Sequence, residues 1–345
     1  MKIPRADIPA APPRPPRAID PGAPAESDDA LFGFPIPPAE ARCVAVPVPY
    51  EATVSSRGGT LDGPRAVIAA SGQVDFFDPL AGEPWRHGLS SLAESAAIRE
   101  LAGRARADAD AARRGDTAAA ARVDDAGREI WDWLDDAVTR LFASGRVPIV
   151  LGGEHAISLG ALRAAARRHP GLGVLHVDAH ADLRGGYEGW ATSHASVMRR
   201  ALELDGLAVL VQVGLRDLGR EEHEAAQAAG PRCAWYPDAT IAERVLGGES
   251  WLSIAREVVA RLPATVWISF DVDGLDPSLC PGTGTPVPGG LGWREATLLL
   301  AALARSGRTV VGADLVEVGA GWWDGFVAAK LLYLLAGVAL GTVPR

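Results

Sequence analysis

Short apolar runs alternate with amphipathic segments along most of the chain. Runs such as VPIVL at 147–151 and LGVLHVD at 172–178 are bounded by turn residues, which is typical of buried strands. Segments such as 124–144 space their apolar residues three and four apart and predict helices. The expected strands are 43–50, 147–151, 172–178, 208–213, 265–271 and 308–316, and the expected helices are 64–71, 124–144, 157–168, 194–205, 218–229, 250–261, 293–306 and 322–338.

This alternation predicts the fold class. Strands that are apolar on both faces and separated by helices belong to a parallel sheet that helices cover on both sides. We therefore expect an α/β protein, a three-layer α-β-α sandwich with a central parallel sheet. Ligands of such folds gather where the carboxyl ends of the strands run into loops.

Two segments depart from the alternation. Residues 1–40 hold 11 of the 26 prolines, and this density denies the backbone both helix and sheet hydrogen bonds. We expect a Pro-rich N-terminal arm there, either a disordered tail or a segment packed on a neighbouring subunit, followed by one domain at 41–345. Residues 103–122 are rich in Ala, Arg and Asp and suit a solvated helix or a surface loop, not a site.

Composition narrows the partners and the compartment. The formal charge of −9 gives no electrostatic footprint for nucleic acid or an anionic membrane, so a cationic small molecule is the better expectation. Cys43, Cys233 and Cys280 are too few and too scattered for a disulfide framework, which favours a reducing cytoplasm. The sequence shows neither a secretory signal nor an apolar run of membrane-spanning length, so we expect a cytoplasmic protein.

Acidic residues and histidines occupy alternate positions in two motifs, HVDAHAD and SFDVDGLDP. Alternate side chains of an extended segment share one face, so each motif directs several metal-binding groups the same way. GGEH adds a histidine directly after the strand at 147–151. All these groups lie at the carboxyl ends of predicted strands and should converge on one rim. The candidate metal ligands are His155, Asp178, His180, Asp182, Asp271 and Asp273.

The number and type of these ligands indicate two ions. Positions i and i+2 of a strand lie about 6.6 Å apart, so the ligands of one strand cannot all reach a single ion. They can serve two ions about 3.5–4 Å apart with bridging carboxylates. A site rich in carboxylate with some imidazole suits Mn²⁺ better than Zn²⁺. Without metal, four clustered carboxylates would repel one another, so ion binding and local order should be coupled.

Simpler interpretations exist for each motif taken alone. A single Asp or His at a strand end is usually a helix cap or turn residue, and GGEH alone is a weak signal. HVDAHAD is more specific, because an apolar strand ending in three ionisable groups would bury uncompensated charge without a cation. DVDGLDP, with Asp276, also resembles a calcium loop, but the strand before it and the missing distal Glu argue against that. The remaining histidines match no ligand spacing and are expected to be ordinary surface or core residues: His87, His169, His176 and His223.

Four motifs together resemble a known family. VLGGEH, HVDAHADLR, SFDVDGLDPSLCPGTGTPVPGGL and DLVEV, in this order, look like the ureohydrolases, the arginase and agmatinase superfamily. VPYEATVSSRGGTLDGPRAVIAAS resembles the family's opening strand, glycine-rich loop and first helix. The resemblance covers roughly residues 42–340. It implies an arginase-like fold, a catalytic domain at 41–345 and a homo-trimer or homo-hexamer.

The resemblance also implies a binuclear manganese centre. One ion is bound by His155 and Asp182, the other by His180 and Asp273, and Asp178 and Asp271 bridge them. Water held between two such ions loses a proton far more readily than bulk water, which provides a hydroxide at neutral pH. Asp182 would also orient this hydroxide for attack on the guanidinium carbon.

Three further residues receive roles from the resemblance. Glu317 matches the carboxylate that binds the substrate guanidinium, a planar cation suited to a bidentate contact. His194 matches a histidine proposed to shuttle a proton to the leaving amine; alternatively it is a surface histidine at a helix start. Asp314 resembles a group that holds the His155 imidazole in the correct tautomer.

The substrate is constrained less closely. DLRGGYEGWATSHASVMRR looks more like agmatinases than arginases, which favours agmatine as substrate and putrescine and urea as products. Glu188 is the nearest acidic partner for a second cation, whereas Arg184 would repel a free amine unless turned away. 4-Guanidinobutyrate, an aminopropylagmatine and arginine are the alternatives. A two-metal phosphoesterase would need cationic groups at the strand ends, and a non-catalytic relative should have lost a ligand; neither pattern is found.

Overall fold

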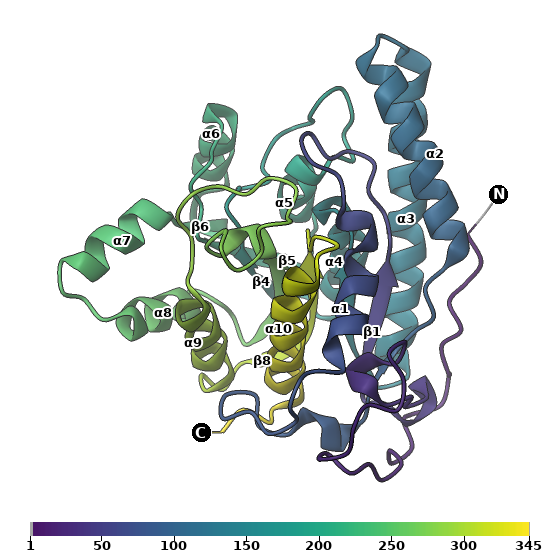
Figure 1. Ribbon diagram of the computed structural model, residues 1–345. Helices are drawn as coiled ribbons and strands as arrows, with labels where there is room; N and C mark the ends of the chain where they lie inside the picture. Colours follow the sequence, from purple (N-terminus) through teal and green to yellow (C-terminus); the bar gives the residue numbers. More distant parts are fainter. Residues whose placement is uncertain (1–2, 345) are drawn as a thin grey trace.

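The computed structural model describes residues 3–344, and a parallel sheet forms the centre of this part of the chain (Figure 1). Its eight strands are ordered β2-β1-β3-β8-β7-β4-β5-β6, and all neighbouring pairs are parallel. Their bounds are β1 Cys43–Val48, β2 Leu89–Ser91, β3 Val147–Gly152, β4 Leu172–Val177, β5 Leu207–Val213, β6 Cys233–Tyr236, β7 Thr265–Asp271 and β8 Thr309–Val316.

Helices cover both faces of this sheet. On one face α1, α10, α9 and α8 pack in succession; on the other, α2, α3, α4 and α5 do so. Figure 1 shows α1, α10 and α9 on the near side of the strands. The predicted α-β-α sandwich is therefore confirmed. The helices are α1 Gly63–Ser71, α2 Ala96–Arg113, α3 Thr117–Ala143, α4 Ser158–Arg168, α5 Val197–Leu202, α6 Arg220–Ala229, α7 Asp238–Leu246, α8 Trp251–Ala260, α9 Trp293–Ala304 and α10 Trp322–Leu340.

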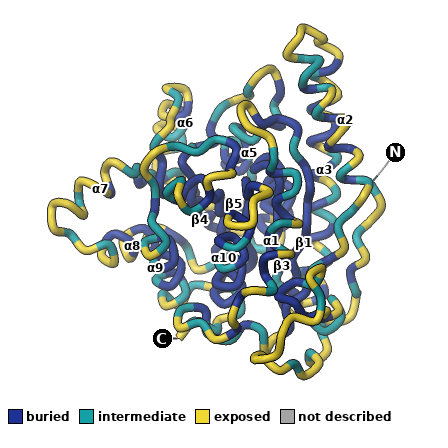
Figure 2. The backbone as a smooth tube through the Cα atoms, viewed as in Figure 1, coloured by how far each residue is buried: buried dark blue, intermediate teal, exposed yellow. Residues whose placement is uncertain are grey.

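The core lies between the sheet and its helices. The inner strands are almost fully buried, and most residues of α10, which packs against them, are buried as well (Figure 2). By length and composition alone, α10 is long and apolar enough to cross a membrane. However, 72% of its most apolar 18-residue stretch is buried inside the fold. Its apolar character is accounted for by its place in the sandwich, where neighbouring helices and strands surround it.

The structure differs from the expected elements in several places. The helix expected at 194–205 is a 3₁₀ turn at 194–196 followed by the six-residue α5. β2, β6 and α7 were not predicted, because the two strands are short edge segments of three and four residues and give almost no periodic signal. The low-complexity segment forms the end of α2 and the start of α3, which meet at Gly115 with a φ of +102°.

The Pro-rich arm packs on its own chain. The Trp133 indole of α3 donates a hydrogen bond to a backbone carbonyl of the arm at 2.8 Å, and Arg140 donates two more. Arg146, which is 2% exposed, donates to the carbonyls of Pro9, Ala11 and Pro38. Side chains of α3 and of the turn after it thus satisfy carbonyls that a Pro-rich segment cannot place in a sheet.

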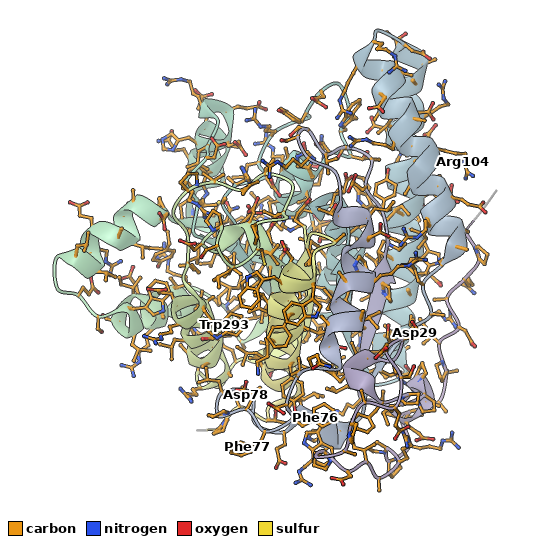
Figure 3. The ribbon with its side chains drawn as sticks, viewed as in Figure 1. Asp29, Phe76, Phe77, Asp78, Arg104 and Trp293 are labelled. Carbon is orange, nitrogen blue, oxygen red and sulfur yellow. The ribbon has the colours of Figure 1, made fainter. Side chains whose placement is uncertain are left out.

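The loop after α1 is tied to α10. Phe76 stacks on Tyr333 of α10 with ring centroids 5.9 Å apart, and Asp78 forms an ion pair with Lys330 at 3.2 Å. Phe77 lies between them in sequence, points outward and is 79% exposed (Figure 3). This contact region joins the N-terminal part of the chain to the last helix.

Candidate metal centre and substrate cavity

The candidate ligands come from neighbouring strands. β3, β8, β7 and β4 are adjacent in the sheet, so their carboxyl ends lie side by side. His155 begins a 3₁₀ turn after β3, and Asp178 directly follows β4. Asp271 is the last residue of β7, and Asp273 lies in the 3₁₀ turn after it. Parallel pairing thereby brings together groups more than a hundred residues apart in the sequence.

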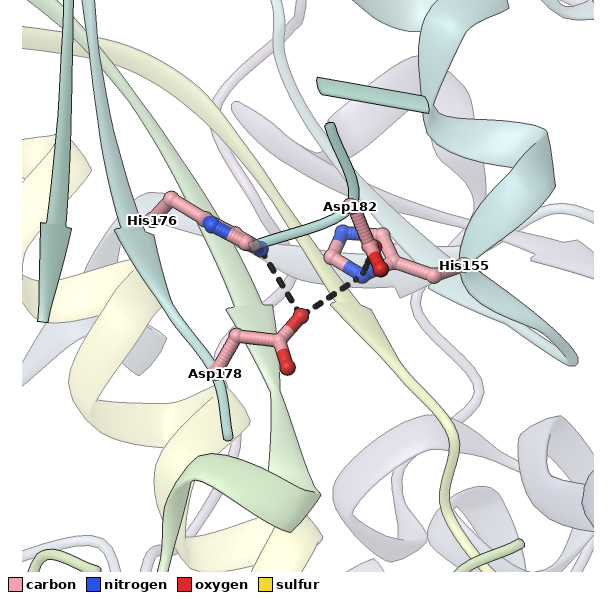
Figure 4. A group of neighbouring side chains, drawn as sticks. All are labelled: His155, His176, Asp178 and Asp182. Carbon is pink, nitrogen blue, oxygen red and sulfur yellow. Dashed lines mark hydrogen bonds and ion pairs between the residues drawn. The ribbon is translucent and has the colours of Figure 1, made fainter. Parts of the chain in front are cut away.

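His155 faces three carboxylates. Its Nδ1 atom lies 3.2 Å from Asp178 Oδ2, 3.1 Å from Asp182 Oδ2 and 3.4 Å from Asp271 Oδ2. The His155 side chain is 1% exposed, and this Nδ1 atom has no hydrogen-bond partner among the described residues. Figure 4 shows the ring directed at Asp178 and Asp182.

A second group of ligands shares Asp178. His180 Nδ1 lies 3.0 Å from Asp273 Oδ2 and 3.4 Å from Asp178 Oδ1. Asp178 therefore presents Oδ2 to His155 and Oδ1 to His180. The two groups can each hold a metal ion, with Asp178 between them.

The other ring nitrogen of His155 defines its tautomer. Nε2 lies 2.8 Å from Ser269 Oγ, and that hydroxyl donates its only hydrogen to Asp314 Oδ1 at 2.6 Å. Ser269 can then only accept from His155, so Nε2 carries a proton, and in the neutral ring Nδ1 presents its lone pair to three carboxylates. That arrangement is repulsive unless a cation lies between them. The residues present therefore fit a metal ion.

Asp314 acts through an intermediate residue. The sequence predicted that it holds His155, but its Oδ1 is 3.8 Å from Nε2, and Ser269 makes the direct contact. Asp314 is fully buried and also accepts hydrogen bonds from Trp267 and Ser158. Its carboxylate fixes the hydroxyl that in turn fixes the imidazole.

His176, expected to be an ordinary histidine, belongs to this centre. Gln212 donates to its Nδ1 at 2.8 Å, so its Nε2 donates to Asp178 Oδ2 at the same distance (Figure 4). His176 is fully buried and positions the shared carboxylate. The sequence contained the signal, because His176 is the first residue of the HVDAHAD motif and shares its alternate spacing.

The carboxylates destabilise one another in the absence of a cation. Burial raises the pKa of Asp271 well above its usual range, and the charges of Asp273 and Asp178 raise it further. Burial likewise raises the pKa of Asp273, with Asp178 adding to the shift. The pKa of Glu317 is raised by burial and then by the charge of Glu154. Divalent cations would relieve this repulsion.

Two site residues have unusual backbone conformations. Asp182 has a φ of +55° and Glu317 a φ of +61°, in the left-handed region that residues other than Gly seldom adopt. Glu317 Oε1 accepts the backbone N–H of His155 at 2.7 Å, and its own N–H donates to Gly153. The turn after β8 therefore braces the turn after β3. Strain of this kind concentrates at functional sites.

A cavity of about 130 Å³ opens beside the ligands. Its lining includes three residues to which the sequence assigned catalysis or binding, His194, Asp182 and Arg184, together with the ligand His180. Glu317 is buried next to His155 and is not part of the lining. The other lining residues are Ser55, Tyr187, Ala195, Asp217, Glu222 and Thr285, none of which the sequence had singled out.

Three charged residues other than the metal ligands line the cavity: Arg184, Asp217 and Glu222. The Arg184 guanidinium lies over the Tyr187 ring at 4.9 Å and 3.9 Å from a Glu222 oxygen. The Asp217 side chain is 71% exposed. Glu188, predicted to meet the substrate, instead pairs with Arg113 of α2 at 2.6 Å and lies outside the lining.

His194 closes one side of the cavity. Its Nδ1 lies 3.1 Å from the hydroxyl of Thr53, and burial lowers its pKa to about 4. The ring is therefore neutral at neutral pH and able to accept a proton.

Three comparisons place the chain among known proteins. A family model described as the arginase family matches residues 41–321. N(1)-aminopropylagmatine ureohydrolase of Synechocystis sp. is 34% identical over 87% of this chain and 89% of its own. Agmatinase of Halalkalibacterium halodurans is 36% identical over 54% of this chain and 61% of its own.

A solved structure agrees with these matches. The agmatine ureohydrolase of Thermoplasma volcanium superimposes with a TM-score of 0.69 and 26% identity, over 87% of this chain and 90% of the other. Family, relatives and fold coincide with a centre of imidazoles and carboxylates at the strand ends. The chain therefore belongs to the arginase family, the ureohydrolases that cleave a carbon–nitrogen bond of guanidino compounds.

Proposed function

We propose that this protein is a binuclear manganese hydrolase that releases urea from an aliphatic guanidine, with agmatine as the favoured substrate and putrescine as the amine product. The observation that carries the proposal is the His155 Nδ1 lone pair, buried and facing three carboxylates. A metal ion held between them would satisfy all four groups at once.

The ligand sets support two ions. His155 and Asp182 would hold one, His180 and Asp273 the other, and Asp178 and Asp271 would lie between them. When bound, such a pair supplies water that ionises near neutral pH. The predominance of carboxylate ligands favours Mn²⁺ over Zn²⁺.

Side chains around the centre would bind the substrate and move its proton. Glu317 has one oxygen on the His155 N–H, and its other oxygen remains for the guanidinium. The absence of a side chain at Gly284 leaves space beside that oxygen, because a Cβ there would lie in van der Waals contact with Glu317 Oε2, at 3.6 Å. His194, neutral and in the cavity wall, would accept a proton and return it to the leaving amine.

The cavity mouth supports a substrate with a distal amine. Asp217 is solvent-exposed and lines the cavity, so its carboxylate is available to an ammonium group. The Arg184 guanidinium lies over the Tyr187 ring and near the Glu222 carboxylate. Both contacts reduce its repulsion of that amine. An aminopropylagmatine, the longer substrate in the name of the Synechocystis relative, presents the same chemistry at this end.

Arg184 also supports a second candidate. It is part of the cavity lining, and its guanidinium could pair with the carboxylate of a guanidino acid such as 4-guanidinobutyrate. Asp217→Asn should then weaken agmatine turnover, whereas Arg184→Gln should weaken turnover of the acid. The variant that shifts the ratio of kcat/KM values identifies the physiological class.

The experiment that tests the proposal is a colorimetric urea assay. The purified protein is assayed against agmatine, an aminopropylagmatine, 4-guanidinobutyrate and arginine, after chelation and after reloading with Mn²⁺. We expect urea release only in the reloaded protein and fastest from agmatine. The absence of urea from all four compounds with two ions bound would contradict the proposal.

A further inference from the structure

Glu154, Thr53 and His194 form a buried chain of hydrogen bonds that reaches the cavity. Thr53 Oγ1 lies 3.0 Å from Glu154 Oε1 and 3.1 Å from His194 Nδ1. Glu154 and Thr53 are fully buried, and neither lines the cavity. They therefore reach the substrate only through the imidazole.

The Glu154 carboxylate accepts from three donors. Oε2 accepts the backbone N–H groups of Ala52 at 3.0 Å and Thr53 at 2.7 Å, and Oε1 accepts the Thr53 hydroxyl. Burial raises the pKa of this carboxyl to about 7, and the three donors act against that shift and favour the ionised form, which can only accept hydrogen bonds. The single hydroxyl hydrogen of Thr53 is consequently directed at Glu154.

The direction of that bond determines what His194 can do. With its hydrogen on Glu154, Thr53 Oγ1 has only acceptor capacity left, and it already accepts the His194 backbone N–H at 3.1 Å. It accepts from the ring as well, so Nδ1 carries the proton of the neutral imidazole. Nε2, for which residues 3–344 provide no hydrogen bond, keeps its lone pair. Ser193 Oγ, 3.5 Å from Nδ1, is too distant to compete.

We propose that Glu154 and Thr53 are positioning residues that fix His194 as the Nδ1–H tautomer and so direct the basic Nε2 toward the substrate cavity. This inference rests on the proposed function, because it assigns a purpose to the proton transfer at His194. As the oxygen of the attacking water bonds to the guanidinium carbon, Nε2 takes a proton from that oxygen. The resulting N–H gives the proton to the amine nitrogen as the carbon–nitrogen bond breaks, which leaves urea and the free amine.

Two substitutions test the chain of hydrogen bonds from Glu154 through Thr53 to His194 in different ways. Thr53→Val preserves the side-chain shape and removes the acceptor of the Nδ1 proton. Glu154→Gln keeps its carbonyl on the two backbone donors, so its amide NH₂ must donate to Thr53. The Thr53 hydroxyl hydrogen then turns to Nδ1, and the ring is forced into the opposite tautomer. General acid–base groups contribute about 10²–10⁴-fold to a rate, so kcat should fall by roughly tenfold or more in Thr53→Val and further in Glu154→Gln.

The experiment measures kcat, KM, bound metal and thermal unfolding for wild type, both variants and Thr53→Ser. We expect kcat to fall in both variants while KM and metal content stay close to wild type, and Thr53→Ser to restore kcat because it returns the hydroxyl. Thr53→Val should also unfold at a lower temperature, because Glu154 Oε1 and the His194 backbone N–H lose a buried partner, whereas Glu154→Gln keeps these hydrogen bonds and should unfold close to wild type. A purely structural role would lower kcat of Glu154→Gln only together with its stability and metal content.

Each of three outcomes would overturn the positioning role of Glu154 and Thr53. An active wild type whose kcat survives in Thr53→Val and Glu154→Gln overturns the positioning role and leaves the hydrolase intact. A metal-loaded wild type that releases no urea overturns the hydrolase, and the positioning role with it. Metal loss in both variants would assign the pair to the support of the metal centre and overturn the inference.

Discussion

At the scale of single residues, the site depends on which nitrogen or oxygen each group leaves free. Ser269 and Asp314 occupy one nitrogen of His155 and direct the other into a group of carboxylates. His176 holds one oxygen of Asp178, and the second oxygen faces His180. Each ligand is thus oriented by a neighbour that does not itself need to touch the metal.

Asp178→Ala should abolish metal binding and activity, because this carboxylate is shared by both ligand groups. Metal content after loading with excess Mn²⁺ and desalting is the measurement. Asp276→Ala is the control: Asp276 follows the ligands Asp271 and Asp273 in the SFDVDGLDP motif but is engaged with Ser278. Two ions per chain in Asp178→Ala would remove Asp178 from the bridging position.

Glu317→Gln should raise KM for the guanidino substrate by about tenfold or more, because a charge-assisted contact is replaced by a neutral one. Both ions should stay bound, since the amide carbonyl can still accept the His155 N–H. Steady-state kinetics combined with metal analysis separates these effects. Loss of metal in this variant would instead make Glu317 a support for the His155 turn.

At the scale of elements, the ligands lie at the carboxyl ends of parallel strands. The alternation of apolar runs and amphipathic segments in the sequence predicted where these strands end. The inner strands β3, β4, β7 and β8 were predictable because each is a continuous apolar run. The cavity wall was not, because Asp217 and Glu222 follow β5 through a loop whose path depends on tertiary packing. Tertiary packing also explains why the prediction for Glu188 was wrong. This residue forms an ion pair with Arg113 of α2, which is distant in the sequence, and does not line the cavity.

Arg146→Ala should lower the free energy of unfolding by about 1–3 kcal/mol, because it removes a buried side chain together with its hydrogen bonds to carbonyls of the arm. It should also increase protease cleavage within residues 3–40. Activity should be retained, since Arg146 precedes β3 and the site lies at the other end of that strand. Arg5→Ala is the control, because this exposed ion pair with Asp136 contributes about 0–1 kcal/mol. Equal stability in both variants would deny the anchoring role.

At the scale of the whole molecule, the fold concentrates negative charge at one rim, and bound cations should stabilise the entire domain. Folding brings the carboxylates together, and their raised pKa values show the cost of doing so without a counter-charge. Chelated protein should therefore unfold at a lower temperature than the manganese-loaded form, and manganese should restore the difference. Identical unfolding curves would show that the cluster does not bind the ion.

Assembly and compartment also belong to the scale of the whole molecule. We propose that the chain assembles as a homo-trimer or homo-hexamer and works in the cytoplasm. Light scattering of the purified, manganese-loaded protein measures the assembly. A mass close to that of one 36.0 kDa chain would contradict it.

The central claim is that two divalent ions lie side by side among His155, His180 and the four aspartates. Elemental analysis of the purified protein, loaded with Mn²⁺ and freed of unbound ion, tests it most directly. The proposed function predicts two manganese ions per chain, falling sharply in Asp178→Ala. One ion per chain, or none, in the wild-type protein would contradict the account.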